Sequence, residues 1–353
     1  MNDRPSQRYA AAVLLAAALF GAGTPFAKLL VGHLTPWMLA GLLYGGSGAG
    51  LGIIVLLRRL SPKQQREAPL RRADTPWLAA TILAGGIAAP VLLLWGLQGT
   101  AASTASLLLN LEGVLTAALA AMGFHEAVGK RIWTAAALML AASGLLAYDP
   151  GAAFSLSPHA LAIMGACLLW ALDNNLTCRI SGGDPLAIGA IKGLAGGGIN
   201  IGLALLTGAL LPAVGQIVAA MTLGLFSYGV SVVLFVYGLR HLGSARTSAH
   251  FSTAPFFGAA LSIALLAEPL SAILAAAAAL MFGATLLALT ERHAHEHRHE
   301  YLAHTHRHTH DDAHHQHEHT GDEGDAPHAH WHVHWSMRHH HPHLPDIHHR
   351  HSH

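Results

Sequence analysis

The sequence predicts an all-α integral membrane protein with ten transmembrane helices in two inverted five-helix repeats, followed by a disordered His-rich tail. Three observations carry this prediction. The chain of 353 residues is 52% hydrophobic and 11% charged, whereas soluble domains carry about 25% charged residues. Residues 1–290 are a series of apolar stretches, each about as long as a membrane span. The last 63 residues hold 24 of the 29 histidines and have no apolar period from which to build a core.

Ten apolar stretches are long enough to cross a bilayer core of about 30 Å as helices. Turn-forming pairs such as Asp149-Pro150, Asp184-Pro185 and Glu268-Pro269 mark several of the connections. The first stretch is too long for a cleaved secretory leader and is therefore expected to be the first span. The expected spans are 9–32, 36–57, 75–96, 100–123, 131–149, 158–180, 185–207, 213–239, 244–267 and 269–290.

Lys and Arg occur in every second connection. The connections near 33–35, 97–99, 150–157, 208–212 and 268 contain neither residue. The alternate segments hold Arg4, Arg8, Arg58, Arg59, Lys63, Arg66, Arg71, Arg72, Lys130, Arg131, Arg179, Arg240, Arg246 and Arg292. Because cytoplasmic connections attract Lys and Arg, both termini are expected in the cytoplasm, with the body in the plasma membrane, the inner membrane of a bacterium.

The two halves of the apolar region resemble each other. Gly96-Leu97 and Glu126 match Gly238-Leu239 and Glu268 at a spacing of 142 residues. Five spans in each half is an odd number, so the halves must be inverted relative to each other in the membrane. Inverted repeats are typical of secondary transporters, whose substrate site lies near the midplane.

The chain is therefore divided into a first repeat over 1–149, a second repeat over 150–290 and the tail over 291–353. Gly-rich runs at 45–48 and 196–198 lack the strand-to-helix context of a phosphate loop and predict close helix packing instead.

A family resemblance rests on Gly21-x-x-x-Pro25-x-x-Lys28, Gly96-Leu97…Ser103-x-x-Ser106…Glu126, Gly238-Leu239…Ser244…Glu268 and Asp184-Pro185-Leu186…Lys192-Gly193. In these motifs the chain resembles the drug/metabolite transporter superfamily, and within it the EamA-type permeases, over about residues 9–290. The resemblance implies ten helices in two inverted repeats and alternating access to a central cavity, with no required cofactor and no named substrate. Two positions depart from the family pattern. Glu112-Gly113 stands where many relatives carry Pro, and Tyr44 where many carry Arg.

Glu112 is the first candidate for a transport residue. It lies near the middle of its span beside Asn110, with no route along which its side chain could reach water. Ionisable groups at membrane depth cost about 2.5–3.5 kcal/mol on insertion scales, so each is a functional hypothesis. A carboxyl group in apolar surroundings can exchange protons near neutral pH or bind a cation. The alternative is a permanently protonated Glu, or one paired with a neighbouring Asn.

The run Asp173-Asn174-Asn175 is a polar step in an otherwise apolar helix. Consecutive residues point about 100° apart, so at least one side chain is expected to line a cavity. The alternative is hydrogen bonding between helices. Lys192 is expected to counter Asp173 or Glu112, to bind an anionic group, or to extend to the cytoplasmic surface.

Three further polar residues complete the expected transport set. Asn200 lies two turns after Lys192, Lys28 lies in the outer part of the first span, and His250 lies in the inner part of the ninth. Outward extension of the Lys28 side chain and ordinary hydrogen-bonded packing of His250 are the alternatives.

Histidines alternate along the tail. A spacing of two places them on one side of an extended chain, where several imidazoles can converge on a single ion. Such tracts suit Zn, Ni, Co or Cu, which gives a possible metal ligand set but no required cofactor. The expected ligands are His293, His295, His297, His299, His304, His306, His308, His310, His328, His330, His332 and His334. Incidental metal affinity of a low-complexity segment and a response to pH are the alternatives.

These observations predict a secondary-active transporter that exports divalent transition-metal ions or a metal-linked metabolite. An organic metabolite or amino-acid permease with a regulatory tail is the alternative. A membrane-anchored metal buffer or sensor that transports nothing is an alternative of another class. The expected partners are the lipid bilayer and a small-molecule or metal-ion substrate, not nucleic acid, and a homodimer is left open. The sequence has no nucleophile–base arrangement that would indicate an enzyme.

Overall fold

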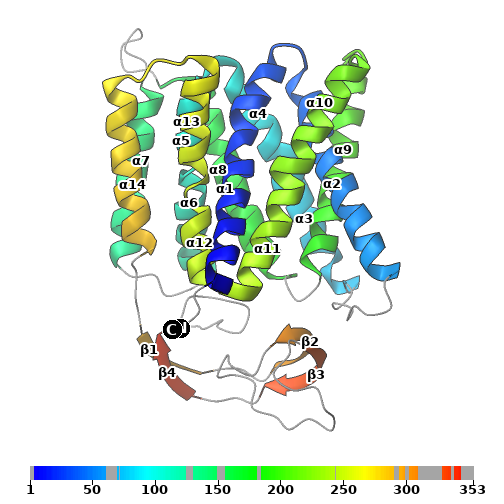
Figure 1. Cartoon of the computed structure of the whole chain (residues 1–353), viewed down its shortest axis with the longest axis vertical. Coiled ribbons are helices and arrows are strands. Elements are labelled where there is room, and N and C mark those ends of the chain that lie inside the picture. Colours follow the sequence, from blue (N-terminus) through cyan, green and yellow to red (C-terminus); the bar gives the residue numbers. More distant parts are fainter. Residues whose placement is uncertain are drawn as a thin grey trace.

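The computed structural model describes residues 4–60, 70, 72–124, 130–148, 156–180, 184–242 and 244–289, and four segments of the tail. The helices stand side by side as one bundle, in which α1 begins and α14 ends at the same end (Figure 1). We call this the lower end and the opposite one the upper end. The chain therefore crosses the bundle from end to end an even number of times.

In the part of the chain that the structure describes, ten helical rods build the bundle. Those of the first half are α1 (Arg4–Val31), α2 (Pro36–Leu60), the continuous α3–η2–α4 (Thr75–Thr81, Ile82–Ala88 and Ala89–Gly99, preceded by η1, Arg72–Asp74), the interrupted α5–α6 (Ala102–Leu108 and Leu111–Phe124) and α7 (Lys130–Ala147). Those of the second half are α8 (Pro158–Cys178), α9 (Pro185–Leu206), the continuous α10–η3–α11 (Val214–Gly224, Leu225–Val230 and Ser231–Leu242), the interrupted α12–α13 (Ser244–Phe251 and Ala254–Leu266) and α14 (Ala272–Leu289).

Nine of the rods, among the described residues, are long and apolar enough to cross a bilayer. The tenth, α7, has 18 residues but begins with Lys130 and Arg131, which lower its mean hydropathy. It stands alongside α14 over its length (Figure 1). The fold class expected from the sequence, ten helices in two repeats, is confirmed.

Local sequence signals explain where several rods begin. Pro36, Pro158 and Pro185 occupy the first helical position, where a missing N–H costs nothing because that group has no partner in the helix. The Asp184 carboxylate accepts a hydrogen bond from the backbone N–H of Leu186 at 2.9 Å and caps α9.

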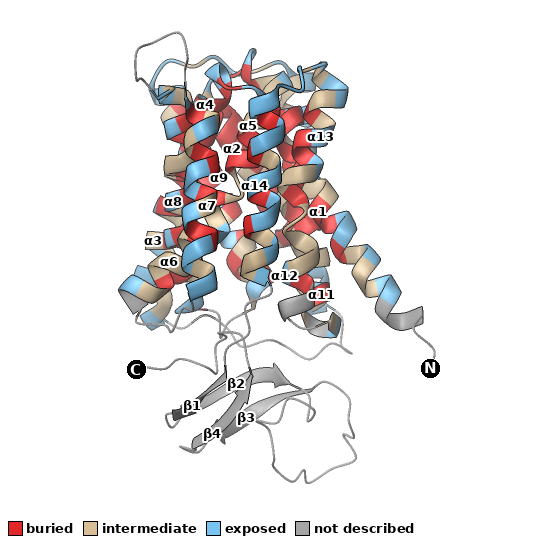
Figure 2. Ribbon diagram, turned by 90° about the vertical axis from the view of Figure 1, so that its left-hand side faces the viewer, coloured by how far each residue is buried: buried red, intermediate tan, exposed pale blue. Residues whose placement is uncertain are grey.

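The bundle exposes large apolar side chains on its outside and packs small ones inside. Figure 2 shows the buried residues on the inward faces of the helices. Outward residues such as Ile53 of α2 and Leu83 of η2 are 58% and 61% exposed, as expected where lipid covers the surface. The rods α2 and α9 approach most closely through glycines: a Cβ atom on Gly193 would lie 2.6 Å from the Cα of Gly48. The close packing predicted from the Gly-rich runs is confirmed.

The backbone irregularities repeat between the halves. The π-helical turns η2 and η3 lie within the third rod of each half. The rods α5–α6 and α12–α13 break near Asn110 and Ser252, which are 142 residues apart. This is the spacing found in the sequence, so the repeat is present in the chain path as well. Glu126, one of the residues matched at that spacing, lies outside the described residues.

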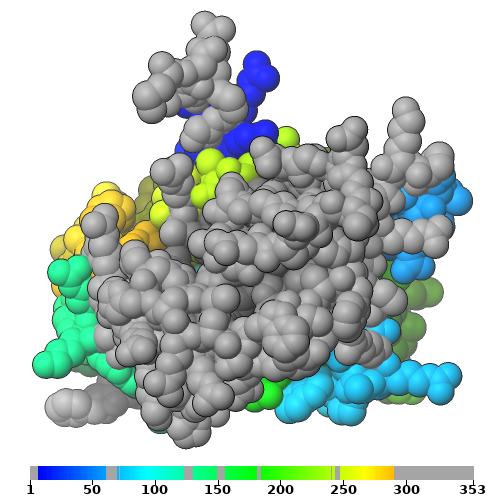
Figure 3. All heavy atoms as spheres, turned by 90° about the horizontal axis from the view of Figure 1, so that it is seen from below, coloured from blue at the N-terminus to red at the C-terminus, as the bar shows by residue number. Residues whose placement is uncertain are grey.

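Basic residues gather at the lower end. Figure 3, which faces that end, shows the beginnings of α1, α3 and α7 and the end of α2 around its periphery. These ends carry Arg8, Arg58, Arg59, Arg72, Lys130 and Arg131. Lys63, Arg66, Arg71 and Arg292 lie outside the described residues. The connections at the upper end contain no Lys or Arg in the sequence.

Four segments of the tail form strands: β1 (Ala294–Arg298), β2 (Leu302–His308), β3 (His328–His334) and β4 (Arg338–Pro342). Strand β1 pairs antiparallel with β4, and β2 with β3. The sequence predicts a disordered tail, and in the described part of the tail the structure has these two strand pairs. The period of two in the sequence matches the alternation of a β-strand.

Candidate functional site

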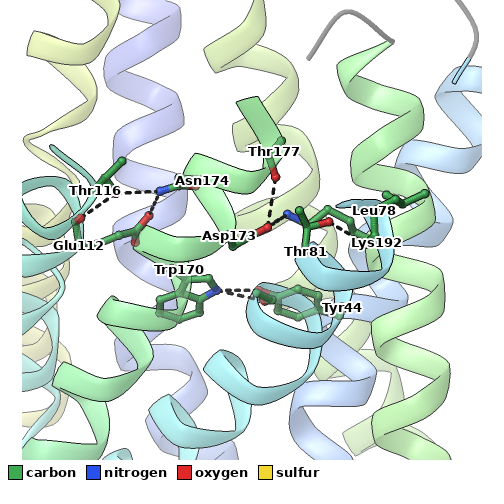
Figure 4. A network of polar contacts seen from close by, with 11 residues as sticks. Tyr44, Leu78, Thr81, Glu112, Thr116, Trp170, Asp173, Asn174, Thr177 and Lys192 are labelled. Carbon is green, nitrogen blue, oxygen red and sulfur yellow. Dashed lines mark hydrogen bonds and ion pairs between the residues drawn. The ribbon is translucent and has the colours of Figure 1, made fainter. Parts of the chain in front are cut away.

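The polar step on α8 lies at the centre of a network that joins α6, α8 and α9 (Figure 4). The ammonium of Lys192 on α9 donates to both carboxylate oxygens of Asp173, at 2.6 and 2.7 Å. The hydroxyl of Thr177, one turn along α8, donates to the same carboxylate at 3.2 Å. Asp173 is only 6% exposed, so this ion pair replaces the water that its charge would otherwise require.

Gly85 on η2 makes room for the Asp173 carboxylate. A Cβ atom at position 85 would lie 2.0 Å from Oδ2 of Asp173, so no other residue fits without displacing that side chain. The π-helical turn is thereby part of the site, in line with the frequent occurrence of such turns at functional positions.

Two backbone carbonyls of the same turn lack their usual helical donors, one because of the π-helical hydrogen bond and one because of a proline. The N–H of Ala89 donates to the carbonyl of Ala84, five residues back. The Gly85 oxygen, which this N–H would bond in an α-helix, is therefore left without that donor. That oxygen instead accepts from the Tyr44 hydroxyl at 2.8 Å and from the Trp170 indole N–H at 3.1 Å. Pro90 has no N–H for the Gly86 oxygen, which accepts from the Asn200 amide at 3.1 Å. Three other helices therefore complete the hydrogen bonding of η2.

Glu112 lies in the first turn of α6, directly after the break in its rod. Helix N-termini favour negative charge, so the break provides a local reason for a carboxylate at this depth. Its Oε1 accepts from the amide of Asn174 on α8 at 2.9 Å. The same amide reaches the hydroxyl of Thr116 at 3.3 Å. Glu112 is thus held by a neutral partner, whereas Lys192 pairs with Asp173.

The three successive polar residues on α8 contact different helices. Asp173 faces α9 and η2, while Asn174 and Asn175 face α6, the latter by donating to the Thr116 carbonyl at 3.0 Å. Asp173 and Asn175 are buried, whereas Asn174 is exposed. Asn174 is therefore the exposed member of the network, Glu112 is half-buried beside it, and the Asp173–Lys192 pair is the enclosed part.

The remaining predicted residues lie elsewhere. The Asn110 amide donates to the Leu107 carbonyl at 3.0 Å and stabilises the break before α6. Lys28 lies at the upper end, where its ammonium donates to the carbonyls of Leu97 and Thr100. His250 lies in α12, beside the break of the second half, and its carbonyl accepts from the Thr253 hydroxyl at 2.6 Å.

No group of three His, Cys, Asp or Glu side chains gathers into a metal site within the described residues. Of the tail histidines predicted as ligands, His293, His299 and His310 lie outside the described residues. The other nine belong to β1, β2 and β3, of which the backbone alone is described.

Sequence reasoning missed Tyr44, Trp170, Thr116 and Gly85 as members of the site. Tyr44 departs from the family pattern, and the Gly85-Gly86 pair followed by Pro90 is a sequence signal for an irregular helix. Trp170 gave no signal, because an aromatic residue in an apolar span is ordinarily part of the packing.

Residues 7–148 and 157–290 match the model of the EamA-like transporter family. The chain belongs to this family. The resemblance to the drug/metabolite transporters predicted from the sequence is confirmed. An "Uncharacterized transporter" of Methanothermobacter thermautotrophicus (strain ATCC 29096 / DSM 1053 / JCM 10044 / NBRC 100330 / Delta H) is 26% identical over 273 residues, which are 73% of this chain and 79% of that relative.

A solved crystal structure is similar to this EamA-like chain with a TM-score of 0.57 and 20% sequence identity. The similarity covers 79% of this chain and 96% of the other, and at this identity it concerns the fold alone. The two matched stretches of the family model each contain five of the helical rods.

Proposed function

We propose that this EamA-like protein is a secondary transporter that works by alternating access, with Glu112 as the group that meets the cargo or a coupling proton. One observation carries the proposal. Glu112 lies at a helix break inside the membrane, beside the exposed Asn174, and its carboxylate is held by a neutral amide rather than a cation. Broken helices at membrane depth are the usual places where transporters bind their substrates.

The proposed orientation places the lower end in the cytoplasm of a bacterial cell, with the body in the inner membrane. The concentration of basic residues at that end supports it. The tail, which follows α14, is then cytoplasmic, and the upper end is external.

The first candidate cargo is a divalent transition-metal ion, or a small organic molecule that carries one. The tail supports this choice. The register of β2 and β3 places His304, His306 and His308 opposite His332, His330 and His328. Pairing thus joins two His-rich segments that are distant in the sequence, and imidazole suits Zn, Ni, Co and Cu. In this proposal the tail collects metal for the lower end of the body.

The second candidate cargo is an organic metabolite or amino acid, with the tail acting only in regulation. One specific observation favours it: Glu112 is accompanied by an amide, and Asp173 is already neutralised by Lys192. One carboxylate with hydrogen-bonding neighbours suits an ammonium group at least as well as a bare metal ion.

The test is flux into vesicles that contain either the full chain or a variant ending at residue 290. Uptake of Ni²⁺, Co²⁺ and Zn²⁺ is measured for each ion alone, and again with citrate or histidine present as an organic carrier. The metal proposal predicts saturable uptake with the shortened body. Uptake of an organic solute without any metal flux would exclude it in favour of the second candidate.

Glu112→Gln keeps the shape of the side chain and removes its charge, so flux should fall at least about tenfold. Asp184→Asn removes a carboxylate that only caps α9 and is the matched control, with flux close to that of the unaltered chain. A membrane-anchored metal buffer or sensor predicts the reverse pattern: Glu112→Gln has no effect, while removal of the tail abolishes the whole metal response.

A further inference from the structure

A carboxylate from the second half of the chain caps a helix of the first half at the upper end. The Glu268 oxygens accept hydrogen bonds from the backbone N–H groups of Ala102 and Ser103, at 2.7 and 2.8 Å. Glu268 lies in the connection between α13 and α14, and the two N–H groups begin α5. Both bonds have a charged acceptor, so they are stronger than bonds between neutral groups. They join the two repeats.

Lys28 binds the short connection between α4 and α5, on the side that faces α4. Its ammonium donates to the carbonyls of Leu97 and Thr100, at the end of α4. A cation therefore lies at the C-terminus of α4 and an anion at the N-terminus of α5, each matching the dipole of its helix. Lys28 and Glu268 also attract each other electrostatically. The connection between α4 and α5 is thus fixed between α1 and the α13–α14 connection.

The residue before Glu268 is held in an unfavourable conformation. Ala267 has φ of 52° and ψ of 35°, the left-handed region, and is the one non-glycine residue with positive φ among the described residues. An L-residue with a Cβ atom disfavours this region. Such strain persists where surrounding contacts enforce it and is often found at switches. Here the next residue, Glu268, is held by two hydrogen bonds to the start of α5.

The two ends of the bundle are packed differently. In the upper half of the bundle, α13 packs against α1 and α5, so closely that a Cβ atom on Gly258 would lie 2.7 Å from the Gly21 oxygen and 2.8 Å from the Ser106 hydroxyl. At the lower end, no contact of similar extent joins the corresponding halves α6 and α12 among the described residues. The upper end is therefore the closed end in this structure.

We propose that Glu268 is a latch that holds the upper end closed and must leave the N-terminus of α5 for that end to open. The latch operates between the repeats: release of the carboxylate frees α13 to separate from α5 and lets Ala267 relax. The inference rests on the proposed alternating access but not on any particular cargo.

The experiment measures access to a single thiol behind the latch. Ser106→Cys is introduced into the full chain after Cys167→Ala and Cys178→Ser, because Ser106 is 1% exposed and contacts Gly258. A membrane-impermeant maleimide is then added to sealed vesicles from the side opposite the tail. Glu268→Ala should raise the labelling rate at least about tenfold, which corresponds to about 1.4 kcal/mol. Ala267→Gly should lower it several-fold, since glycine adopts the latched conformation without strain.

Asp184→Ala is the matched control. It also removes a carboxylate that caps a helix, but within a single connection at the lower end, so labelling should not change. Monodispersity on size exclusion establishes folding. If Glu268→Ala does not fold, Glu268→Gln, which keeps one acceptor oxygen, should give an intermediate increase. An unchanged rate in a folded Glu268 variant, or an equal rise in Asp184→Ala, would overturn the latch. Because labelling needs no cargo, a failure of metal flux leaves this result unaffected.

Discussion

The two π-helical turns have the same backbone defect, but its hydrogen bonding is completed in different ways. In η2 the N–H of Ala89 bonds five residues back to Ala84, and in η3 the N–H of Ser231 does the same to Phe226. Each turn therefore leaves one carbonyl without its helical donor, that of Gly85 and that of Ser227. These two residues are 142 positions apart, the spacing of the repeat.

The Ser227 carbonyl is satisfied within its own helix, because the Ser231 hydroxyl donates to it. The Gly85 carbonyl is satisfied from two other helices, by Tyr44 of α2 and Trp170 of α8. The packing differs in the same way. Asp173 of α8 fits against Gly85 of η2, whereas η3 packs against α1, where a Cβ atom on Gly23 would lie 3.2 Å from the Cβ of Ser227. The chain path is thus symmetric, while among the described residues the ion pair lies at the first turn and not at the second.

Among changes at the two turns, the largest loss of stability is expected when the ion pair is broken. Lys192→Met leaves the Asp173 charge buried without a partner, so the free energy of unfolding should fall by about 3–5 kcal/mol. Denaturant titration in detergent, followed by tryptophan fluorescence, measures it. The double variant Asp173→Asn with Lys192→Met makes the site neutral, like its counterpart, and should recover most of the loss. A double variant as unstable as the single one would show that the charges are not the cause.

The second largest loss of stability is expected at Gly85 of η2, where the Asp173 carboxylate lies close to the backbone. Gly85→Ala places a Cβ atom against the Asp173 carboxylate and should destabilise the protein by about 2 kcal/mol. Gly198→Ala is the matched control, because a Cβ atom there meets no neighbour within 4 Å. It should be neutral or stabilising by up to about 1 kcal/mol. Equal thermal stability of the two variants in detergent would contradict the tight fit at Gly85.

The third largest loss of stability is expected at η3, where the Ser231 hydroxyl donates to the Ser227 carbonyl. Ser231→Ala leaves the Ser227 carbonyl without that donor in a buried position, which should cost about 1–2 kcal/mol. The readout is the midpoint of thermal unfolding, with Thr207→Val as the control, since the Thr207 hydroxyl bonds its own helix at an exposed end. A loss no larger than that of the control would mean that the Ser227 carbonyl finds another donor.

The smallest effect is expected at Tyr44. Tyr44→Phe removes one of two donors to the Gly85 carbonyl, and the Trp170 indole remains on that oxygen, so the loss should stay under about 1 kcal/mol. It should be smaller than that of Ser231→Ala when the two are measured side by side. The opposite order would show that Tyr44 is the principal donor.

The sequence by itself determined the number of spans, the inverted repeat, the family and the choice of Glu112 and the Asp173 step as polar residues at membrane depth. These features depend on local properties. A span is recognised by the length of an apolar run, and an unusual residue by its contrast with immediate neighbours. The alternation in the tail likewise specified an extended chain, which is the conformation of β1 to β4.

Only the tertiary structure decided which polar residues meet. Lys192 could have countered either carboxylate, and its side chain selects Asp173. Tyr44 and Trp170 belong to the site because η2 leaves the Gly85 carbonyl without a helical donor. The Lys28 side chain binds carbonyls at the upper end of α4. The physical reason is that the rotation of each helix about its own axis, and the position of each break, follow from packing against neighbours that are distant in the sequence. Hydropathy and spacing describe one helix at a time and contain no information about that rotation.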